Sequence, residues 1–249
     1  THMWNTSDDA AAESFRTIRT VLVMGTEDSE RIAVTSAEPS DGKTTISGNL
    51  AIAYQQAGKR VLIIDADMRK PGLTKVIDRR GQVGLSDILR GTEEVPEQAS
   101  SLATQTGSVP VDIIPAGRRP PNPGELLLGD RFAELLAWAD GEYDQVIVDA
   151  PPVLAGTDAA AVGRLCDGLL LVVRPEKNRR RVLIKAVETL RMFGVTLFGT
   201  VVNAVGLEEM GYGYGYGYGY GYGYGDEYGL DDDDEYGDEE EEETYMRAA

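Results

Sequence analysis

The chain has 249 residues, 42% of them hydrophobic, and is therefore long enough for one or two domains with a sizeable buried core. Its net charge is −18, but residues 206–249 alone hold fifteen acidic residues and one arginine, a net charge of −14. Residues 1–205 are thus nearly neutral, which excludes the basic surface typical of a nucleic-acid-binding domain, so we predict no nucleic-acid partner.

The N-terminal segment contains a charged pattern with helical spacing. Residues 1–7 open with Thr-His-Met, which resembles a cloning remnant or leader, and we assign them no function. The segment AAESFRTIRTVL places Glu13, Arg16 and Arg19 three residues apart, on one face of a predicted helix. From spacing alone, they form an exposed stripe whose Glu–Arg pairs contribute a few tenths of a kcal/mol.

Six short segments rich in Val, Ile and Leu predict β-strands that are apolar on both faces. Segments with a helical period separate them, so we predict an α/β fold with a mainly parallel central sheet flanked by helices. One predicted helix, 43–58, ends at a glycine; another, 178–194, starts at Asn178 as its N-cap and also ends at a glycine. The predicted strands are 31–37, 60–67, 111–117, 144–152, 168–175 and 197–205.

Two further features bound the class of protein. Cys166 is the only cysteine, which excludes an internal disulfide and fits a reducing compartment. No run of about 18 apolar residues is present, so no membrane span is predicted. We predict one domain at residues 8–205 and a disordered, acidic, Gly-Tyr-rich tail at 206–249, where the apolar periodicity disappears.

A phosphate-binding loop follows the first predicted strand. Residues 35–45, TSAEPSDGKTT, match the pattern G-x-x-x-x-G-K-[ST], with Ala37 in place of the first glycine. A strand leads into the segment and a helix leads out, so backbone amides are predicted to hold phosphates, Lys43 to reach the β/γ oxygens and Thr44 to bind Mg²⁺. The residues predicted to contact ATP here are Pro39, Ser40, Asp41, Gly42, Lys43, Thr44 and Thr45.

Three aspartates lie at or near the C-terminal ends of two predicted strands. Asp65 and Asp67 are separated by one residue, so both can face the crevice at the strand ends. Asp149 follows the apolar residues Val-Ile-Val and is a candidate for holding Mg²⁺. The alternative for the first two is a solvated turn neutralised by Arg69 and Lys70. The alternative for Asp149 is a cap of the next segment.

The segments TSAEPSDGKTT, LIIDADMRKP and VIVDAPPV, with GLSDILRG and IPAGRRPPNPGELL between the last two, resemble the bacterial tyrosine kinases. These are P-loop NTPases of capsule and exopolysaccharide synthesis, and the resemblance covers residues 13–205. It implies that Lys43, Asp65 and Asp67 are catalytic, with either aspartate as the base that accepts the tyrosine proton. It also implies a Mg²⁺ held by Thr44, Asp65 and Asp149, and an adenine recognised by Asn203.

The resemblance further implies that the kinase phosphorylates its own C-terminal tyrosines between subunits. The stripe Glu13, Arg16 and Arg19 would then join subunits into a ring-shaped homo-oligomer, such as an octamer. Other implied partners are a transmembrane adaptor and a tyrosine phosphatase, with the kinase in the cytoplasm at the inner face of the membrane. The implied phosphate acceptors are Tyr212, Tyr214, Tyr216, Tyr218, Tyr220, Tyr222, Tyr224, Tyr228, Tyr236 and Tyr245.

Two alternative functions, and the role of one basic surface, stay open. The sheet also resembles ParA/MinD-type ATPases, but those carry a lysine five positions before the P-loop lysine, where this chain has Glu38. The Gly-Tyr tract could instead be a low-complexity adhesive segment on an ATPase. The basic stretch 178–181, with Arg118 and Arg119, is either a receptor for the acidic tail or an exposed helix start.

Overall fold

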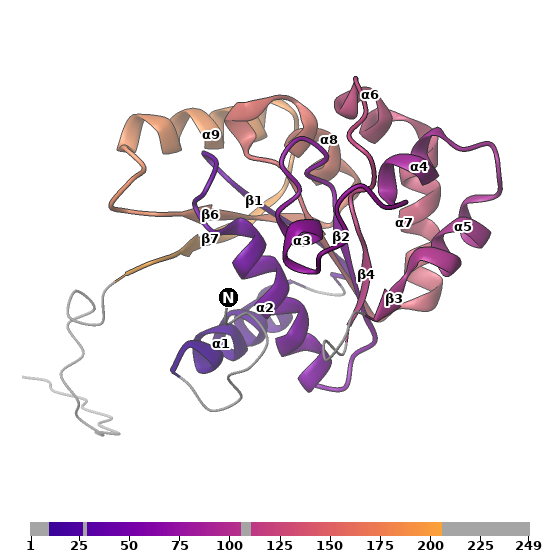
Figure 1. Cartoon of the computed structure of the whole chain (residues 1–249). Coiled ribbons are helices and arrows are strands. Elements are labelled where there is room, and N and C mark those ends of the chain that lie inside the picture. Colours follow the sequence, from indigo (N-terminus) through magenta and orange to yellow (C-terminus); the bar gives the residue numbers. More distant parts are fainter. Residues whose placement is uncertain (1–9, 27–28, 106–110, 206–249) are drawn as a thin grey trace, which may run out of the picture. The chain divides into compact units, whose positions relative to one another are not determined.

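The computed structural model describes residues 10–26, 29–105 and 111–205, so residues 1–7 and the predicted tail tyrosines lie outside the described residues. The helices, drawn in Figure 1, are α1 (Ala10–Gly25), α2 (Lys43–Gln56), α3 (Gly72–Val76), α4 (Leu85–Arg90), α5 (Val95–Leu102), α6 (Pro123–Leu128), α7 (Asp130–Glu142), α8 (Asp158–Leu165) and α9 (Arg180–Met192). The strands are β1 (Arg31–Ser36), β2 (Val61–Asp65), β3 (Thr104–Gln105), β4 (Asp112–Ile114), β5 (Gln145–Asp149), β6 (Gly168–Val173) and β7 (Leu197–Val202).

The strands form one sheet in the order β3-β4-β2-β5-β1-β6-β7. Every neighbouring pair is parallel except β3 with β4, which is antiparallel. All six predicted strands and the mainly parallel sheet are confirmed. The sequence did not predict β3, because two residues are too few to show a period.

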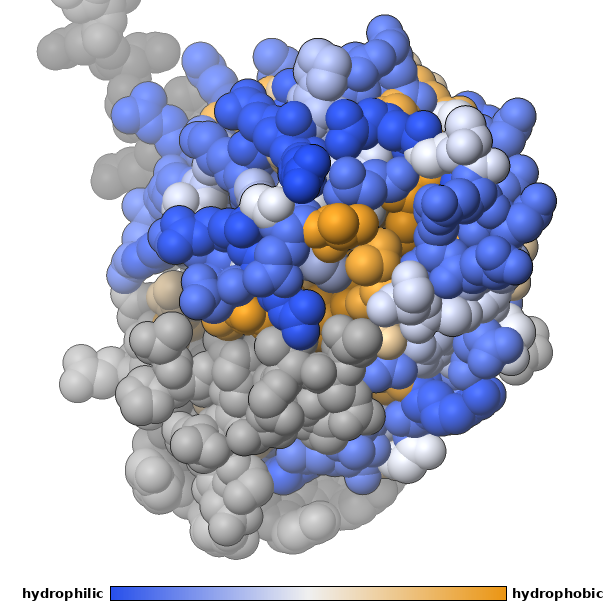
Figure 2. Space-filling model, turned by 45° about the vertical axis from the view of Figure 1, so that its right-hand side comes forward, coloured by the Kyte–Doolittle hydropathy of each residue, from blue (hydrophilic) through white to orange (hydrophobic). Residues whose placement is uncertain are grey.

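Helices cover both faces of the sheet, as Figure 1 shows with α1 and α2 on one side and α8 and α9 on the other. The strands are apolar on both faces because alternate residues face different helix layers: Ile32 and Val34 belong to the same buried cluster as Leu50 of α2, whereas Ala33 belongs to the cluster that contains Phe132 of α7. The surface seen in Figure 2 is mainly hydrophilic, with a small apolar area at its centre. No helix of the described residues has the length and apolar composition to cross a bilayer.

One predicted helix start is wrong. Helix α9 begins at Arg180 with Arg179 at the N-cap, so Asn178 does not cap it. The Asn178 side chain instead accepts a hydrogen bond from the backbone N–H of Arg174 (2.7 Å) and donates to the carboxylate of Asp41 (3.2 Å). This asparagine therefore ties the β6–α9 turn to the P-loop.

The strand order brings the predicted site together. Parallel β1, β2 and β5 are the central strands, so the segments that follow them emerge at the same edge of the sheet. In the register of β2 with β5, Asp65 pairs directly with Asp149. The P-loop follows β1 next to them, and two aspartates 84 residues apart in sequence become neighbours behind the P-loop lysine.

Candidate active site

A cavity of about 390 Å³ opens at this edge of the sheet. Residues from three segments line it: 39–44 of the P-loop, 67–72 after β2 and 151–155 after β5. Five predicted nucleotide contacts, Pro39, Ser40, Gly42, Lys43 and Thr44, are on its wall. Asp41, Thr45 and Asn203 are not among the lining residues.

The backbone of the loop has a shape that only some residues permit. Gly42 has φ +100° immediately before α2, and a Cβ on it would lie 2.0 Å from the Asn203 side-chain nitrogen. Ser40 also has positive φ, at 67°. Together they turn the chain tightly into the start of α2, where backbone N–H groups are available for phosphate oxygens.

Lys43 lies between two carboxylates. Its ammonium is 3.1 Å from Asp67 Oδ2 and 3.4 Å from Asp149 Oδ1, and all three side chains are almost fully buried. Asp149 also accepts hydrogen bonds from Thr44 Oγ1 (2.7 Å) and from Ser47 Oγ (3.1 Å). Asp149 therefore does not cap the next segment, and the ammonium of Lys43 holds Asp67 and Asp149 together.

Burial and neighbouring charges perturb these groups in opposite directions. Burial alone would lower the pKa of Lys43, but Asp149, Asp67 and Asp65 outweigh burial and raise it, so the ammonium stays charged. Burial first, and then the charge of Asp149, raise the pKa of Asp65 to about 7. Burial likewise raises the pKa of Asp149. The site therefore has more buried carboxylate than one lysine neutralises.

Asp65 and Asp67 take different positions, which corrects the prediction that both face the crevice. Asp65, the last residue of β2, accepts hydrogen bonds from Thr74 N (2.8 Å) and Thr74 Oγ1 (2.7 Å) and does not line the cavity. Asp67 lines the cavity and accepts from the backbone N–H of Lys70 (2.9 Å). The alternation of side chains ends where β2 ends, so of these two aspartates only Asp67 faces the cavity.

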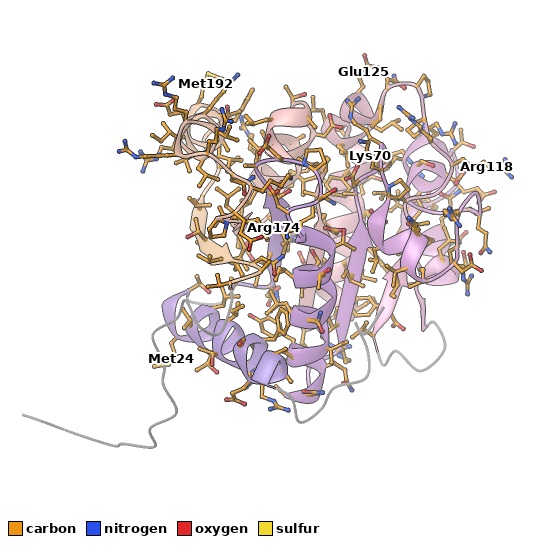
Figure 3. The ribbon with its side chains drawn as sticks, turned by 60° about the vertical axis from the view of Figure 1, so that its left-hand side comes forward. Met24, Lys70, Arg118, Glu125, Arg174 and Met192 are labelled. Carbon is orange, nitrogen blue, oxygen red and sulfur yellow. The ribbon has the colours of Figure 1, made fainter. Side chains whose placement is uncertain are left out.

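The alternative of a solvated acidic turn is also wrong. Asp65 and Asp67 are 0% and 2% exposed. The ion pair of Arg69 is formed elsewhere, since its guanidinium pairs with Asp158 at 2.7 and 3.2 Å. Lys70, labelled in Figure 3, is exposed on the cavity rim, and its side chain has no partner among the described residues.

A second set of side chains holds the P-loop from the side away from the cavity. The carboxylate of Asp41 is fully buried, and Lys177 (2.6 Å) and Asn178 (3.2 Å) donate to it. Asn203 donates from its side-chain nitrogen to the Asp41 carbonyl (2.8 Å). Sequence reasoning missed Lys177 and gave Asn178 another role, because neither residue is near the loop in sequence.

The side chains and backbone N–H groups around the cavity fit a nucleoside triphosphate with Mg²⁺. A Cβ on Gly72 would lie 2.5 Å from Thr44 Oγ1, so the absence of a side chain there keeps the Thr44 hydroxyl accessible. No group of three or more His, Cys, Asp or Glu side chains in the described part could hold a metal by itself. Mg²⁺ sites beside a bound nucleotide use one or two carboxylates and take their other ligands from phosphates and water. Asp149 and the Thr44 hydroxyl would supply the protein ligands of such a site.

The charged stripe of α1 is divided between two roles in the structure. Arg16 pairs with Glu13 at 3.0 Å, as its spacing predicts. Arg19 instead donates to the backbone carbonyl of Ala53 at 2.8 Å and so fastens α1 to α2. The structure holds a single copy of the chain, so the contact of these three residues with a second subunit stays a prediction.

Comparison with known proteins places these features in a family. A family model described as an AAA domain matches residues 29–192. The tyrosine-protein kinase wzc of Salmonella typhimurium is 40% identical over 206 residues, which cover 82% of this chain and 28% of that protein. YwqD of Bacillus subtilis, a tyrosine-protein kinase, is 37% identical and covers 81% of this chain and 85% of that protein. The kinase domain of Escherichia coli tyrosine kinase ETK superposes with a TM-score of 0.76 at 36% identity, covering 87% and 84% of the two chains.

Proposed function

The chain belongs to the bacterial tyrosine kinase family, and from this premise we propose that it is an ATP-dependent protein-tyrosine kinase that phosphorylates its own C-terminal tyrosines between subunits. The observation that supports this most is the position of Asp67. Its buried carboxylate lines the cavity beside the P-loop and is held against Lys43 at 3.1 Å. A base at that place is what transfer to a tyrosine requires.

The phenol of tyrosine has a pKa of about 10 and is mostly protonated at neutral pH, so it needs a proton acceptor as it attacks. Asp67 accepts that proton while the phenol oxygen bonds to the γ-phosphorus and the bond to the leaving ADP oxygen breaks. Lys43 stabilises the negative charge on the transferred group and on ADP. Asp65 does not touch the reacting atoms; it positions the turn that carries Asp67, because Asp67 N donates to Asp65 Oδ1 (3.2 Å).

Thr44 and Asp149 would hold a Mg²⁺ ion, which neutralises charge on the β- and γ-phosphates when bound. Gly42 and the start of α2 give the phosphates backbone N–H donors. Asn203 holds the loop from behind in this structure, and its proposed adenine contact would come from the part of its amide that the loop does not use. Asp65 is a weaker candidate for the metal, because Thr74 already donates to it twice.

The whole protein's partners are part of the proposal. We infer a ring-shaped homo-oligomer through Glu13, Arg16 and Arg19, a transmembrane adaptor at the inner face of the cytoplasmic membrane, and an opposing tyrosine phosphatase. The names of related proteins, among them a putative tyrosine-protein kinase in a cps region of Klebsiella pneumoniae, support a role in polysaccharide synthesis and export. The substrates in this proposal are the ten tail tyrosines, Tyr212 to Tyr245.

The second candidate, a ParA/MinD-like ATPase with an interaction tail, is less well supported. Such ATPases would need a lysine at position 38 that reaches across to a second subunit. Glu38 has the opposite charge, and its carboxylate accepts a hydrogen bond from Asn178 within the same chain (2.9 Å). That bond holds position 38 against the β6–α9 turn of its own subunit.

The test is incubation of the full chain with Mg-ATP, followed by mass spectrometry of the tail. The expected result is phosphotyrosine that Asp67→Asn abolishes. Asp78→Asn is the matched control, because Asp78 is exposed on the same stretch after β2 and asparagine tolerates its φ of 55°. A Lys43→Met chain labelled by the unaltered chain would establish transfer between subunits. ATP hydrolysis without any phosphotyrosine would instead support the second candidate.

A further inference from the structure

Three consecutive arginines stand exposed at the start of α9. Arg179 is its N-cap, and Arg180 and Arg181 are its first two residues. None of the three side chains has a hydrogen bond or an ion pair within the part of the chain that the structure describes. The neighbouring charges are already compensated, since Arg174 pairs with Glu176 at 3.3 Å and Lys177 with Asp41 at 2.6 Å.

The position of these arginines does not serve the helix. The N-terminus of a helix is the positive end of its dipole, which disfavours cations and favours acids. The apolar side of α9 is buried through Ala186 and Leu190, whereas the side chains of the three arginines are exposed. Three arginines at a position where they destabilise the helix indicate a role other than helix stability.

The cluster 179–181 adjoins the P-loop. The two residues before it both bond to the loop: Lys177 donates to the carbonyl of Pro39 and Asn178 to the carboxylate of Asp41. In Figure 3, Arg174 marks the end of β6 near this turn, and Met192 marks the far end of α9. The cluster therefore lies on the P-loop side of the domain, whereas the rest of α9 extends away from it.

We propose that Arg179, Arg180 and Arg181 form a docking site for the acidic run 231–243 of another copy of the chain. This run has eleven acidic residues in thirteen, with no basic residue among them. Residues 1–205 are nearly neutral overall, and three consecutive arginines that have no partner among the described residues form a surface of opposite sign to this acidic segment. The acids of this run follow one another closely in the sequence, which suits a contact with a short basic stretch of consecutive arginines.

Docking would bring the acceptor tyrosines to the neighbour's active site, and this use of the surface rests on the proposed function. Tyr224 precedes the acidic run by seven residues, which is about 23 Å of extended chain at roughly 3.3 Å per residue. The Gly-Tyr tract would then be held near the P-loop of the docked copy. Docking itself involves no phosphoryl transfer, so a binding assay tests it even if the proposed function is wrong.

The experiment uses the full chain with the eleven acids of residues 231–243 changed to Asn or Gln, so that only an added peptide carries them. The probe is a fluorescent peptide of sequence 231–243 with Tyr236→Phe, and binding is measured by anisotropy without nucleotide. On this background, Arg180→Glu with Arg181→Glu should weaken binding at least about tenfold, because two attractive pairs become repulsive. Glutamates at these positions suit the helix dipole, so α9 should stay folded, which circular dichroism verifies.

The matched control is Lys185→Glu with Arg191→Glu, the same change of charge in the later turns of the same helix. It should leave peptide binding within about twofold of the background chain, since its residues lie farther from the P-loop. Equal loss in both variants would show a diffuse charge effect and overturn the docking site, as would no loss in either. Equal binding of a probe with Asn and Gln in place of its acids would overturn the charge basis.

Discussion

Replacing Lys43 by Met tests the buried charge cluster and the catalytic proposal together. The lysine is the cation that lies between Asp67 and Asp149, at 3.1 and 3.4 Å. At an effective dielectric constant of about 20, each contact is worth about 5 kcal/mol of Coulomb energy, but burying the ammonium offsets much of that gain. Removing one partner of a buried ion pair usually costs about 3–5 kcal/mol, because the remaining charge loses its compensation.

The loss should depend on pH, with a definite sign. An aspartate whose pKa is raised in the folded state binds a proton more tightly there than in the unfolded chain. Its contribution to stability therefore falls as the pH rises from its unfolded pKa of about 4 towards its folded pKa. For Asp65 the folded value is already about 7, and without Lys43 the cluster should titrate higher still. Lys43→Met should thus be much closer to the unaltered chain in stability at pH 5 than at pH 8.

Urea unfolding at both pH values, in EDTA, measures this difference, and labelling with Mg-ATP measures activity. A typical stability of about 5–15 kcal/mol leaves the variant folded, with self-phosphorylation reduced by orders of magnitude. The double variant Lys43→Met with Asp67→Asn removes one uncompensated charge at nearly constant volume, and should regain stability but no activity. Equal stability of Lys43→Met and the unaltered chain at pH 8 would refute the charge argument, and normal labelling would refute the P-loop assignment.

Three further predictions concern α1, the cysteine and the tail. Changing Arg16 and Arg19 to Ala should turn a large particle into monomers in light scattering and, because the Arg19 bond to α2 is lost, lower the free energy of unfolding by about 1 kcal/mol; an unchanged large particle would contradict the ring. Burial raises the pKa of the Cys166 thiol to about 12, so iodoacetamide at pH 8.5 should modify it roughly a thousandfold more slowly in the native chain than in urea, and equal rates would contradict this. Single Tyr→Phe changes from Tyr212 to Tyr224 should barely alter total labelling, whereas changing all seven should remove most of it; one dominant site in mass spectra would argue against equal access.

The sequence predicts those parts of the site whose structure is determined by a short continuous segment of the chain. The P-loop is a continuous strand–loop–helix segment whose glycine and lysine have fixed roles, so Gly42, Lys43 and Thr44 could be placed before the fold was known. Apolar runs likewise predicted all six longer strands, because the continuous apolar run of a strand buried on both faces is visible within a few residues. The two-residue β3 gave no such signal.

The parts that sequence could not predict depend on contacts between distant segments. Asp65 and Asp67 look equivalent in D-x-D, and only Thr74 bonding to Asp65 separates a positioning acid from one that faces the cavity. The short spacing favours Arg69 as the cation that neutralises these acids, yet its ion-pair partner is Asp158, 89 residues later. A residue's side-chain partner across the fold is set by strand order and helix packing, which the local pattern does not contain.

The last strand leads to a residue that supports the P-loop. The matched family model ends at residue 192, the last residue of α9, and so leaves β7 outside. Yet β7 leads to Asn203, whose backbone N–H donates to the carbonyl of Val173 (2.8 Å) and whose side chain donates to the carbonyl of Asp41 (2.8 Å). Gly42 accepts this approach because it has no Cβ. The P-loop therefore takes its shape from the residues before it and also from a strand about 160 residues later, which is why the functional unit has to extend to Asn203.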